Sequence, residues 1–302
     1  MDGKKFLVLD GALGTELVRT GFDIKDDPLW SARLLVNNRD AIKNVHKSFL
    51  LSGADVLITA TYQASIEGLI QHCGLDKSKA TAVIHDAVKI AHEACNEICS
   101  SRKHKRCFIA GSVGPYGACQ HDMSEYTGKY VNKMSLKELM NWHRPRVEAL
   151  LHAGVDILAF ETIPALKEAE ALVQLLKEFP TAKAWLTLSC QDGSHTCHGE
   201  LFSDIVQTVN HSKQIVAVGV NCTSPLFVKS LLQSIKGKIT LPFVVYPNCG
   251  GEWKEGENEP DVHLCSYVKE WIQAGACWIG GCCGTQPGDV KKIRQIVDTQ
   301  GK

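Results

Sequence analysis

Eight short apolar runs, each able to form a buried strand, recur along the chain and alternate with stretches of helical periodicity. Nearly continuous apolar strands that are each followed by a helix predict a parallel sheet covered by helices. A count of eight in 302 residues favours an α/β fold of the closed (β/α)8 type, a TIM barrel, with an open doubly wound sheet as the alternative. The predicted strands are Phe6–Asp10, Ala54–Thr59, Cys107–Ser112, Val155–Glu161, Ala184–Ser189, Ile215–Val220, Pro242–Tyr246 and Cys277–Gly280.

The ends of several helices can also be predicted. Ser135 and Glu138 have the spacing of a capping box, and Gly154 would end the helix that begins there. A later helix is predicted from Pro260 to Ala274. No linker or shift in composition divides the chain, so we expect residues 1–302 to form a single domain.

The charge of the chain narrows the choice of partners. Lysine plus arginine equals aspartate plus glutamate, 33 of each, so no basic field is available to bind nucleic acid or an anionic membrane. The amino terminus lacks an apolar signal core, and no apolar stretch approaches the roughly 20 residues of a membrane span. We therefore expect a cytoplasmic protein, a monomer or small homo-oligomer, whose partners are small molecules.

The carboxyl ends of the predicted strands indicate where chemistry would occur, because active sites of (β/α)8 barrels collect there. Polar and thiol side chains stand at seven of these ends. Candidates for substrate or metal contact are Asp10, Thr59, Tyr62, Ser112, Glu161, Asn221, Cys222, Tyr246, Cys282 and Cys283.

Cysteine is abundant, and three of the 13 thiols fall at these strand ends. Cys282 and Cys283 are adjacent, which makes a poor disulfide, whereas the flanking glycines let the backbone bend so that both sulfurs can bind one ion. With Cys222 as a third ligand, this is the pattern of a catalytic zinc site that keeps one position open. The alternative is a buried structural pair and an unrelated core thiol.

A second group of possible metal ligands, His195-Thr196-Cys197-His198, follows the fifth predicted strand. Its residue types suit zinc, but no fourth partner is evident. Because it lies in a polar segment beside Asp192-Gly193, a solvated turn is the favoured interpretation.

Three segments resemble a known enzyme family: Asp10-Gly-Ala-Leu-Gly-Thr-Glu16, Gly219-Val-Asn-Cys222 and Gly280-Gly-Cys-Cys-Gly-Thr285. In this order they are similar to the homocysteine S-methyltransferases, zinc-dependent (β/α)8 enzymes, and the likeness extends over essentially the whole chain. The resemblance implies that Cys222, Cys282 and Cys283 hold one Zn²⁺ whose fourth ligand is the thiolate of L-homocysteine. It also implies that Asp10 and Glu161 bind the amino group of that substrate. The chemistry agrees, since a thiol with a pKa of about 8.5 is mostly protonated at neutral pH and zinc favours its thiolate.

The resemblance leaves the methyl donor less defined. All candidate donors are cations that aromatic faces can bind, and the aromatic residues near the predicted rim are Trp30, Tyr62, Tyr116, Tyr246 and Trp253. Betaine-using members have an aromatic residue after the fourth-strand glutamate and a long carboxyl-terminal extension, whereas here Thr162 follows Glu161 and about 17 residues follow Thr285. These differences favour a sulfonium donor, S-methylmethionine or S-adenosylmethionine, with betaine, or selenium analogues of the acceptor, as alternatives.

Two other classes of function are alternatives for these residues. A metallohydrolase on the same barrel is disfavoured, because the first strand ends in Leu9-Asp10-Gly11 without a His-x-His motif and thiolate-bound zinc is a weak Lewis acid. A non-enzymatic thiol sensor would use Cys282 and Cys283 as oxidisable groups without bound metal.

Overall fold

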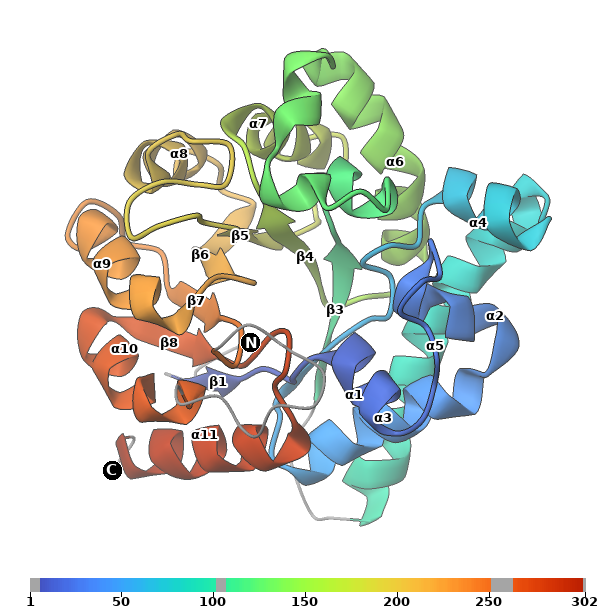
Figure 1. Cartoon of the computed structure of the whole chain (residues 1–302), viewed down its shortest axis with the longest axis horizontal. Helices are drawn as coiled ribbons and strands as arrows, with labels where there is room; N and C mark the ends of the chain where they lie inside the picture. Colours follow the sequence, from blue (N-terminus) through green and yellow to red (C-terminus); the bar gives the residue numbers. More distant parts are fainter. Residues whose placement is uncertain (1–5, 102–106, 251–262, 301–302) are drawn as a thin grey trace.

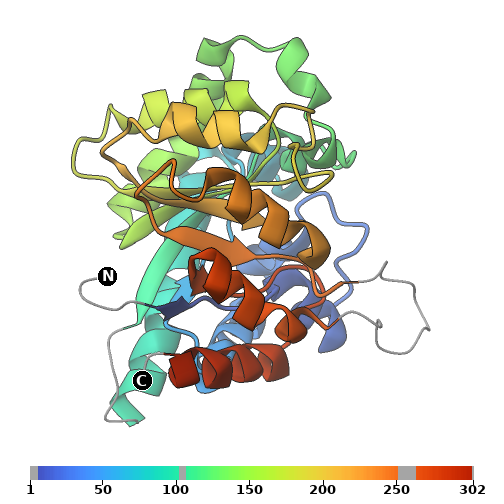
Figure 2. The same ribbon diagram turned by 90° about the vertical axis from the view of Figure 1, so that its left-hand side faces the viewer.

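The computed structural model describes residues 6–101, 107–250 and 263–300. Eight parallel strands form one sheet in the order β1-β8-β7-β6-β5-β4-β3-β2, and a parallel bridge between Leu9 and Val56 joins its two edges. The strands form the centre and the helices an outer ring (Figure 1). The perpendicular view shows the helices packed around the outside of the strands (Figure 2). The predicted (β/α)8 barrel is therefore confirmed.

The strands are short, and all eight overlap the predicted ones. They are β1 (Leu7–Val8), β2 (Val56–Ile58), β3 (Phe108–Val113), β4 (Ile157–Ile163), β5 (Ala184–Leu188), β6 (Ile215–Asn221), β7 (Phe243–Tyr246) and β8 (Ala276–Ile279). The α-helices are α1 (Leu13–Arg19), α2 (Arg33–Asn37), α3 (Arg39–Leu51), α4 (Ile66–Cys73), α5 (Lys77–Ser101), α6 (Leu136–His152), α7 (Leu166–Leu176), α8 (Phe202–Val209), α9 (Pro225–Ile235), α10 (Val268–Ala274) and α11 (Pro287–Gln300). Short 3₁₀ turns are η1 (Trp30–Ala32), η2 (Tyr116–Cys119), η3 (Ser124–Tyr126), η4 (Lys129–Asn132) and η5 (Leu264–Ser266).

The predicted helix ends are confirmed at α6 and only partly confirmed at α10. Ser135 and Glu138 form the capping box of α6, and Gly154 follows its end with a left-handed backbone. The helix predicted from Pro260 is shorter where the structure describes it, because η5 precedes an α-helix that begins only at Val268; Pro260 lies outside the described residues. None of the described helices combines the length and the apolar character that crossing a membrane requires.

Two apolar layers hold the barrel together. Side chains alternate along each strand, so that Val8 faces the helices while Leu7 and Leu9 face the inside. The interior is filled mainly by large side chains, among them Trp185 and Tyr246, whose hydroxyl accepts a hydrogen bond from the Trp185 indole at 2.9 Å. Because the centre of the barrel is packed, space for a ligand is left at the ends of the strands.

Candidate active site

A cavity of about 1410 Å³ lies at the carboxyl ends of the strands. Its lining residues lie in the last part of, or after, β1, β2, β3, β4, β6, β7 and β8, so most of the barrel contributes to it. Of the predicted site residues, it is lined by Asp10, Thr59, Tyr62, Ser112, Glu161, Asn221, Cys222, Tyr246, Cys282 and Cys283. The residues predicted from the carboxyl ends of the strands therefore line one cavity.

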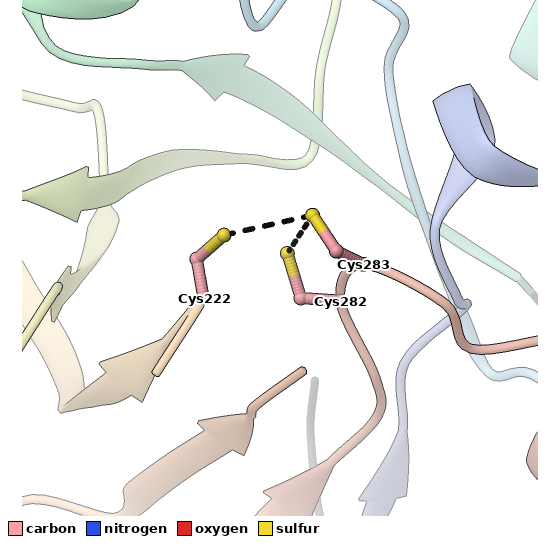
Figure 3. A group of neighbouring side chains, drawn as sticks. All are labelled: Cys222, Cys282 and Cys283. Carbon is pink, nitrogen blue, oxygen red and sulfur yellow. Dashed lines mark hydrogen bonds between the residues drawn. The ribbon is translucent and has the colours of Figure 1, made fainter. Parts of the chain in front are cut away.

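Three thiols meet at one side of this cavity. Cys222 directly follows β6, and Cys282 and Cys283 follow β8 (Figure 3). The sulfur of Cys283 lies 3.8 Å from that of Cys222 and 4.0 Å from that of Cys282, and all three lie within 4.8 Å of one another. Ligands at tetrahedral corners about 2.3 Å from an ion are about 3.8 Å apart. The three sulfurs thus have the spacing that one zinc ion requires.

The backbone around the thiols is unusual at two points. Cys222 has a positive φ of 49°, which a non-glycine residue adopts rarely. After β8, Gly284 provides the bend with φ of 81°, whereas a Cβ at Gly281 would overlap the side chain of Thr285. The glycines around the adjacent cysteines therefore serve close packing as well as bending.

The proximity of the thiols changes their acidity. Hydrogen bonds from Cys222 and Cys282 hold the pKa of the Cys283 thiol well below its usual value. The pKa of Cys282 is raised, first by its hydrogen bonds to Cys222 and Cys283 and further by burial. Without a cation the cluster favours one thiolate, so a divalent ion is needed to stabilise three.

Two buried carboxyl groups line the cavity from other strands. Asp10 is 2% exposed, its Oδ2 accepts the N–H of Ile58 at 2.9 Å, and its Oδ1 has no hydrogen-bond partner among the described residues. Glu161 is 6% exposed and accepts a hydrogen bond from the hydroxyl of Ser112. Burial raises the pKa of Asp10 well above its usual value, and the charge of Glu161 adds to this. Burial also raises the pKa of Glu161 to about 7. Such a pair favours a cationic ligand.

Two other predicted substrate contacts, Thr59 and Asn221, already form hydrogen bonds within the protein. Thr59 bonds with the hydroxyl of Thr61 at 2.8 Å and accepts the N–H of Ser112 at 3.0 Å. The amide group of Asn221 accepts the N–H of Thr162 and donates to its hydroxyl, both at 2.7 Å. Thr162 has a positive φ of 61°, so Asn221 holds a strained turn at the end of β4.

The aromatic residues predicted to bind the methyl donor differ in whether they line the cavity. Trp30, Tyr62 and Tyr246 line the cavity, although the hydroxyl of Tyr246 is already bonded inside the barrel. Tyr116 is not among the cavity-lining residues, and its ring packs 5.0 Å from that of Trp142 and 5.3 Å from that of Tyr130. Trp253 lies outside the described residues.

The histidines after β5 do not form a metal cluster. His195 pairs with Asp192 at 3.0 Å and His198 with Glu200 at 2.8 Å, as expected for a polar loop. Among the described residues, the three-thiol cluster is the one group of at least three side chains with metal-binding geometry.

Sequence reasoning missed the residues that the loop between β3 and α6 brings to the cavity. His121, Met123, Glu125 and Tyr126 all line it, and the hydroxyl of Tyr126 lies 3.0 Å from the sulfur of Cys222. The available signal was length, because a loop of about 20 residues at this end of a barrel is more often functional than structural.

Comparison with known proteins agrees with this site. Residues 7–297 match the family model for homocysteine S-methyltransferase. The chain belongs to the homocysteine S-methyltransferase family. Among its homocysteine S-methyltransferase relatives, the betaine-homocysteine S-methyltransferase of Drosophila melanogaster is 41% identical over 98% of this chain and 96% of its own length. Homocysteine S-methyltransferase YbgG of Bacillus subtilis is 41% identical over 97% of this chain and 95% of its own length. The solved structure of Escherichia coli MmuM in its metallated form superposes with a TM-score of 0.89, at 40% identity over 98% of this chain and 97% of that one.

Proposed function

We propose that this protein transfers a methyl group from a sulfonium donor to the thiol of L-homocysteine, forming methionine, with one Zn²⁺ per chain held by Cys222, Cys282 and Cys283. The observation that carries the proposal is the sulfur spacing of 3.8 and 4.0 Å, which matches tetrahedral zinc. When bound, zinc would supply a stable thiolate of the substrate at neutral pH. Membership of a methyltransferase family and the metallated relative support the same assignment.

Asp10 and Glu161 would recognise the amino-acid end of homocysteine. Both carboxyl groups are buried, both line the cavity, and Asp10 Oδ1 has no partner among the described residues. An ammonium group placed between them would supply the missing hydrogen bonds and would restore their charged forms. This pair would select homocysteine over a plain thiol.

The donor must be positively charged at the atom that loses its methyl group. The homocysteine sulfur forms the new S–C bond with its own electron pair, and the old C–S bond breaks with its pair left on the donor sulfur. The donor thereby becomes a neutral sulfide, and with S-methylmethionine both products are methionine.

We favour S-methylmethionine over betaine because Thr162, and not an aromatic residue, follows Glu161 and is held by Asn221. Chain length does not separate the two donors, since the Drosophila relative named for betaine is matched over 96% of its length. S-adenosylmethionine carries the same sulfonium chemistry and is the second donor to test. We place the reaction in the cytoplasm, where the cysteine thiols of the described chain would stay reduced.

The test is a methionine assay with zinc-loaded protein, homocysteine and one donor at a time. S-methylmethionine should give the fastest turnover, and Cys282→Ser should lose both bound zinc and activity while keeping the circular dichroism of the barrel. Cys95→Ser, a buried cysteine of α5 that does not line the cavity, is the matched control and should retain zinc. Activity with betaine alone would overturn the donor assignment, and normal turnover by a zinc-free Cys282→Ser protein would overturn the metal assignment.

A further inference from the structure

One buried carboxyl group of the cavity has no role in the reaction described so far. Glu125 belongs to η3, in the loop between β3 and α6, and is only 8% exposed. It lines the cavity, and its Oε2 is buried with no hydrogen-bond partner among the described residues. A buried carboxylate oxygen without a partner is unfavourable unless a ligand satisfies it.

Among the described residues, no positively charged side chain pairs with Glu125, although Lys25 and Lys292 also line the cavity. Burial is the main cause that raises its pKa, and the negative groups Asp122 and Cys283 raise it further. The described residues form no ion pair with it, in contrast to Glu16 of α1, which pairs with Arg19 at 2.6 Å. This side of the cavity therefore has an unmet preference for a cation.

The loop also holds Glu125 firmly in place beside the thiols. Its carbonyl oxygen accepts the hydroxyl of Ser189 at 3.4 Å, and its neighbour Tyr126 places a hydroxyl 3.0 Å from the sulfur of Cys222. Glu168, itself fully buried, accepts the N–H of Tyr116 at 2.7 Å and so fixes the start of the same loop. The backbone that carries Glu125 is thus supported on both sides.

The position of Glu125 relative to the acceptor defines what it can bind. Asp10 and Glu161 already account for the ammonium group of homocysteine, and its sulfur would sit at the three thiols. The donor has to approach that sulfur from the remaining side of the cavity, in line with the bond that breaks. Glu125 lines the same cavity as the thiol cluster, and its neighbour Tyr126 has its hydroxyl 3.0 Å from the sulfur of Cys222. A positive charge next to the transferred methyl group would therefore lie near this carboxylate.

We propose that Glu125 is the anionic group that binds the positively charged methyl donor and distinguishes it from the neutral product. The proposal rests on the proposed methyl transfer. Before transfer, the sulfonium charge pairs with the carboxylate; after transfer, the donor sulfur is neutral, the pairing is lost and the spent donor dissociates. Because much of the positive charge is still on the donor sulfur at the transition state, the attraction is similar in the bound ground state and in the transition state, so Glu125 should lower KM for the donor and leave kcat nearly unchanged.

The test compares S-methylmethionine with 2-amino-5-methylhexanoic acid, its neutral isostere in which carbon replaces the sulfonium. In Glu125→Gln, KM for S-methylmethionine should rise by roughly 10- to 100-fold, because a charge–charge attraction in a partly buried site is lost. KM for homocysteine, kcat, zinc content and the inhibition constant of the isostere should change less than about threefold. Glu125→Asp should recover part of the donor affinity. Asp122→Asn, an exposed charge on the same loop whose side-chain oxygen still caps Ser124, should resemble the wild type.

Calorimetry on the metal-free protein supplies a readout without turnover. The wild type should bind S-methylmethionine more tightly than the isostere, and Glu125→Gln should lose that preference. An unchanged preference in Glu125→Gln would overturn the proposal, as would equal weakening of both ligands, which would indicate a purely structural role. If no donor methylates homocysteine, the proposed function fails, whereas the calorimetric preference for the cation still reports on Glu125 alone.

Discussion

Replacing Glu161 by glutamine should stabilise the metal-free protein above neutral pH while weakening its use of homocysteine. Glu161 is 6% exposed, and burial raises its pKa from 4.5 to about 7 in spite of the hydrogen bond from Ser112 and the attraction of Arg146. Each tenfold change in proton affinity is worth about 1.4 kcal/mol, so the buried charge destabilises the folded state by about 3 kcal/mol. Glutamine has no charge and still offers an oxygen to the Ser112 hydroxyl.

The raised pKa of Glu161 determines how the free energy of unfolding of the wild type changes with pH. Below about pH 4.5 the carboxyl group is protonated in both the folded and the unfolded protein, and it adds no pH dependence. Between about 4.5 and 7 the folded state binds more protons than the unfolded state, so the free energy of unfolding of the wild type falls as pH rises. Above about pH 7 the buried carboxyl group is ionised in the folded protein, and it destabilises the folded state by the full amount. The advantage of Glu161→Gln should therefore grow over this window and level off by about pH 8 at about 3 kcal/mol.

Urea unfolding followed by circular dichroism at pH 5, 6, 7 and 8, with a chelator present, measures the difference. Asp10 contributes a slope of the same sign to both proteins, and because the charge of Glu161 also raises the pKa of Asp10, the difference curve reports Glu161 together with its coupling to Asp10. Asp204→Asn, an exposed carboxylate on α8, is the matched control and should follow the wild type. In the zinc-loaded enzyme, Glu161→Gln should lower kcat/KM for homocysteine by roughly 10- to 100-fold through loss of a charge-assisted hydrogen bond. A stability difference that does not change between pH 5 and 8 would refute the reasoning.

Three further substitutions test the supports of the site. Gly281→Ala would overlap the side chain of Thr285 and displace the adjacent thiols, so zinc affinity measured by chelator competition should fall by roughly 10- to 100-fold with the barrel intact. Gly219→Ala would place a methyl group on a backbone oxygen of β7, and urea unfolding should show a loss above about 3 kcal/mol, whereas a near-neutral result would contradict the described strand contact. Glu168→Gln should weaken the buried contact with His143 and cost about 1–3 kcal/mol of unfolding free energy, with unchanged zinc content as its control readout.

The fold was predictable because every level of the sequence points to it. Apolar runs of β-branched residues alternate with capped helices, and parallel strands with two buried faces leave little freedom in their pattern. Errors occurred at element ends, as at α10, where the sequence suggests a helix from Pro260 and a turn at Tyr267 delays it to Val268. Periodicity does not resolve such ends, since one turn of 3₁₀ helix and the first turn of an α-helix have nearly the same side-chain pattern.

The site was predictable where a strand end determines the position of a side chain. Cys222 and Glu161 come together because parallel strands aim their carboxyl ends at one face. Glu125 and Tyr126 reach the same cavity through a loop whose path depends on left-handed backbone at His121 and Met123, with φ of 54° and 61°. No periodicity encodes those angles in non-glycine residues. The loop residues therefore had to come from the structure.

The buried carboxyl groups and the three thiols of the cavity have one electrostatic property in common. Three buried carboxyl groups, Asp10, Glu125 and Glu161, have raised pKa values because of burial, and three thiols crowd within 4.8 Å. Each feature destabilises the empty protein, and each would be relieved by a cation: a substrate ammonium, a cationic donor or a divalent metal. The stabilising effects of the separate ligands would be additive only if no two ligands bind the same side chain. Because the charge of Glu161 raises the pKa of Asp10, these two carboxyl groups would share a ligand and a charge state, and their contributions should be coupled.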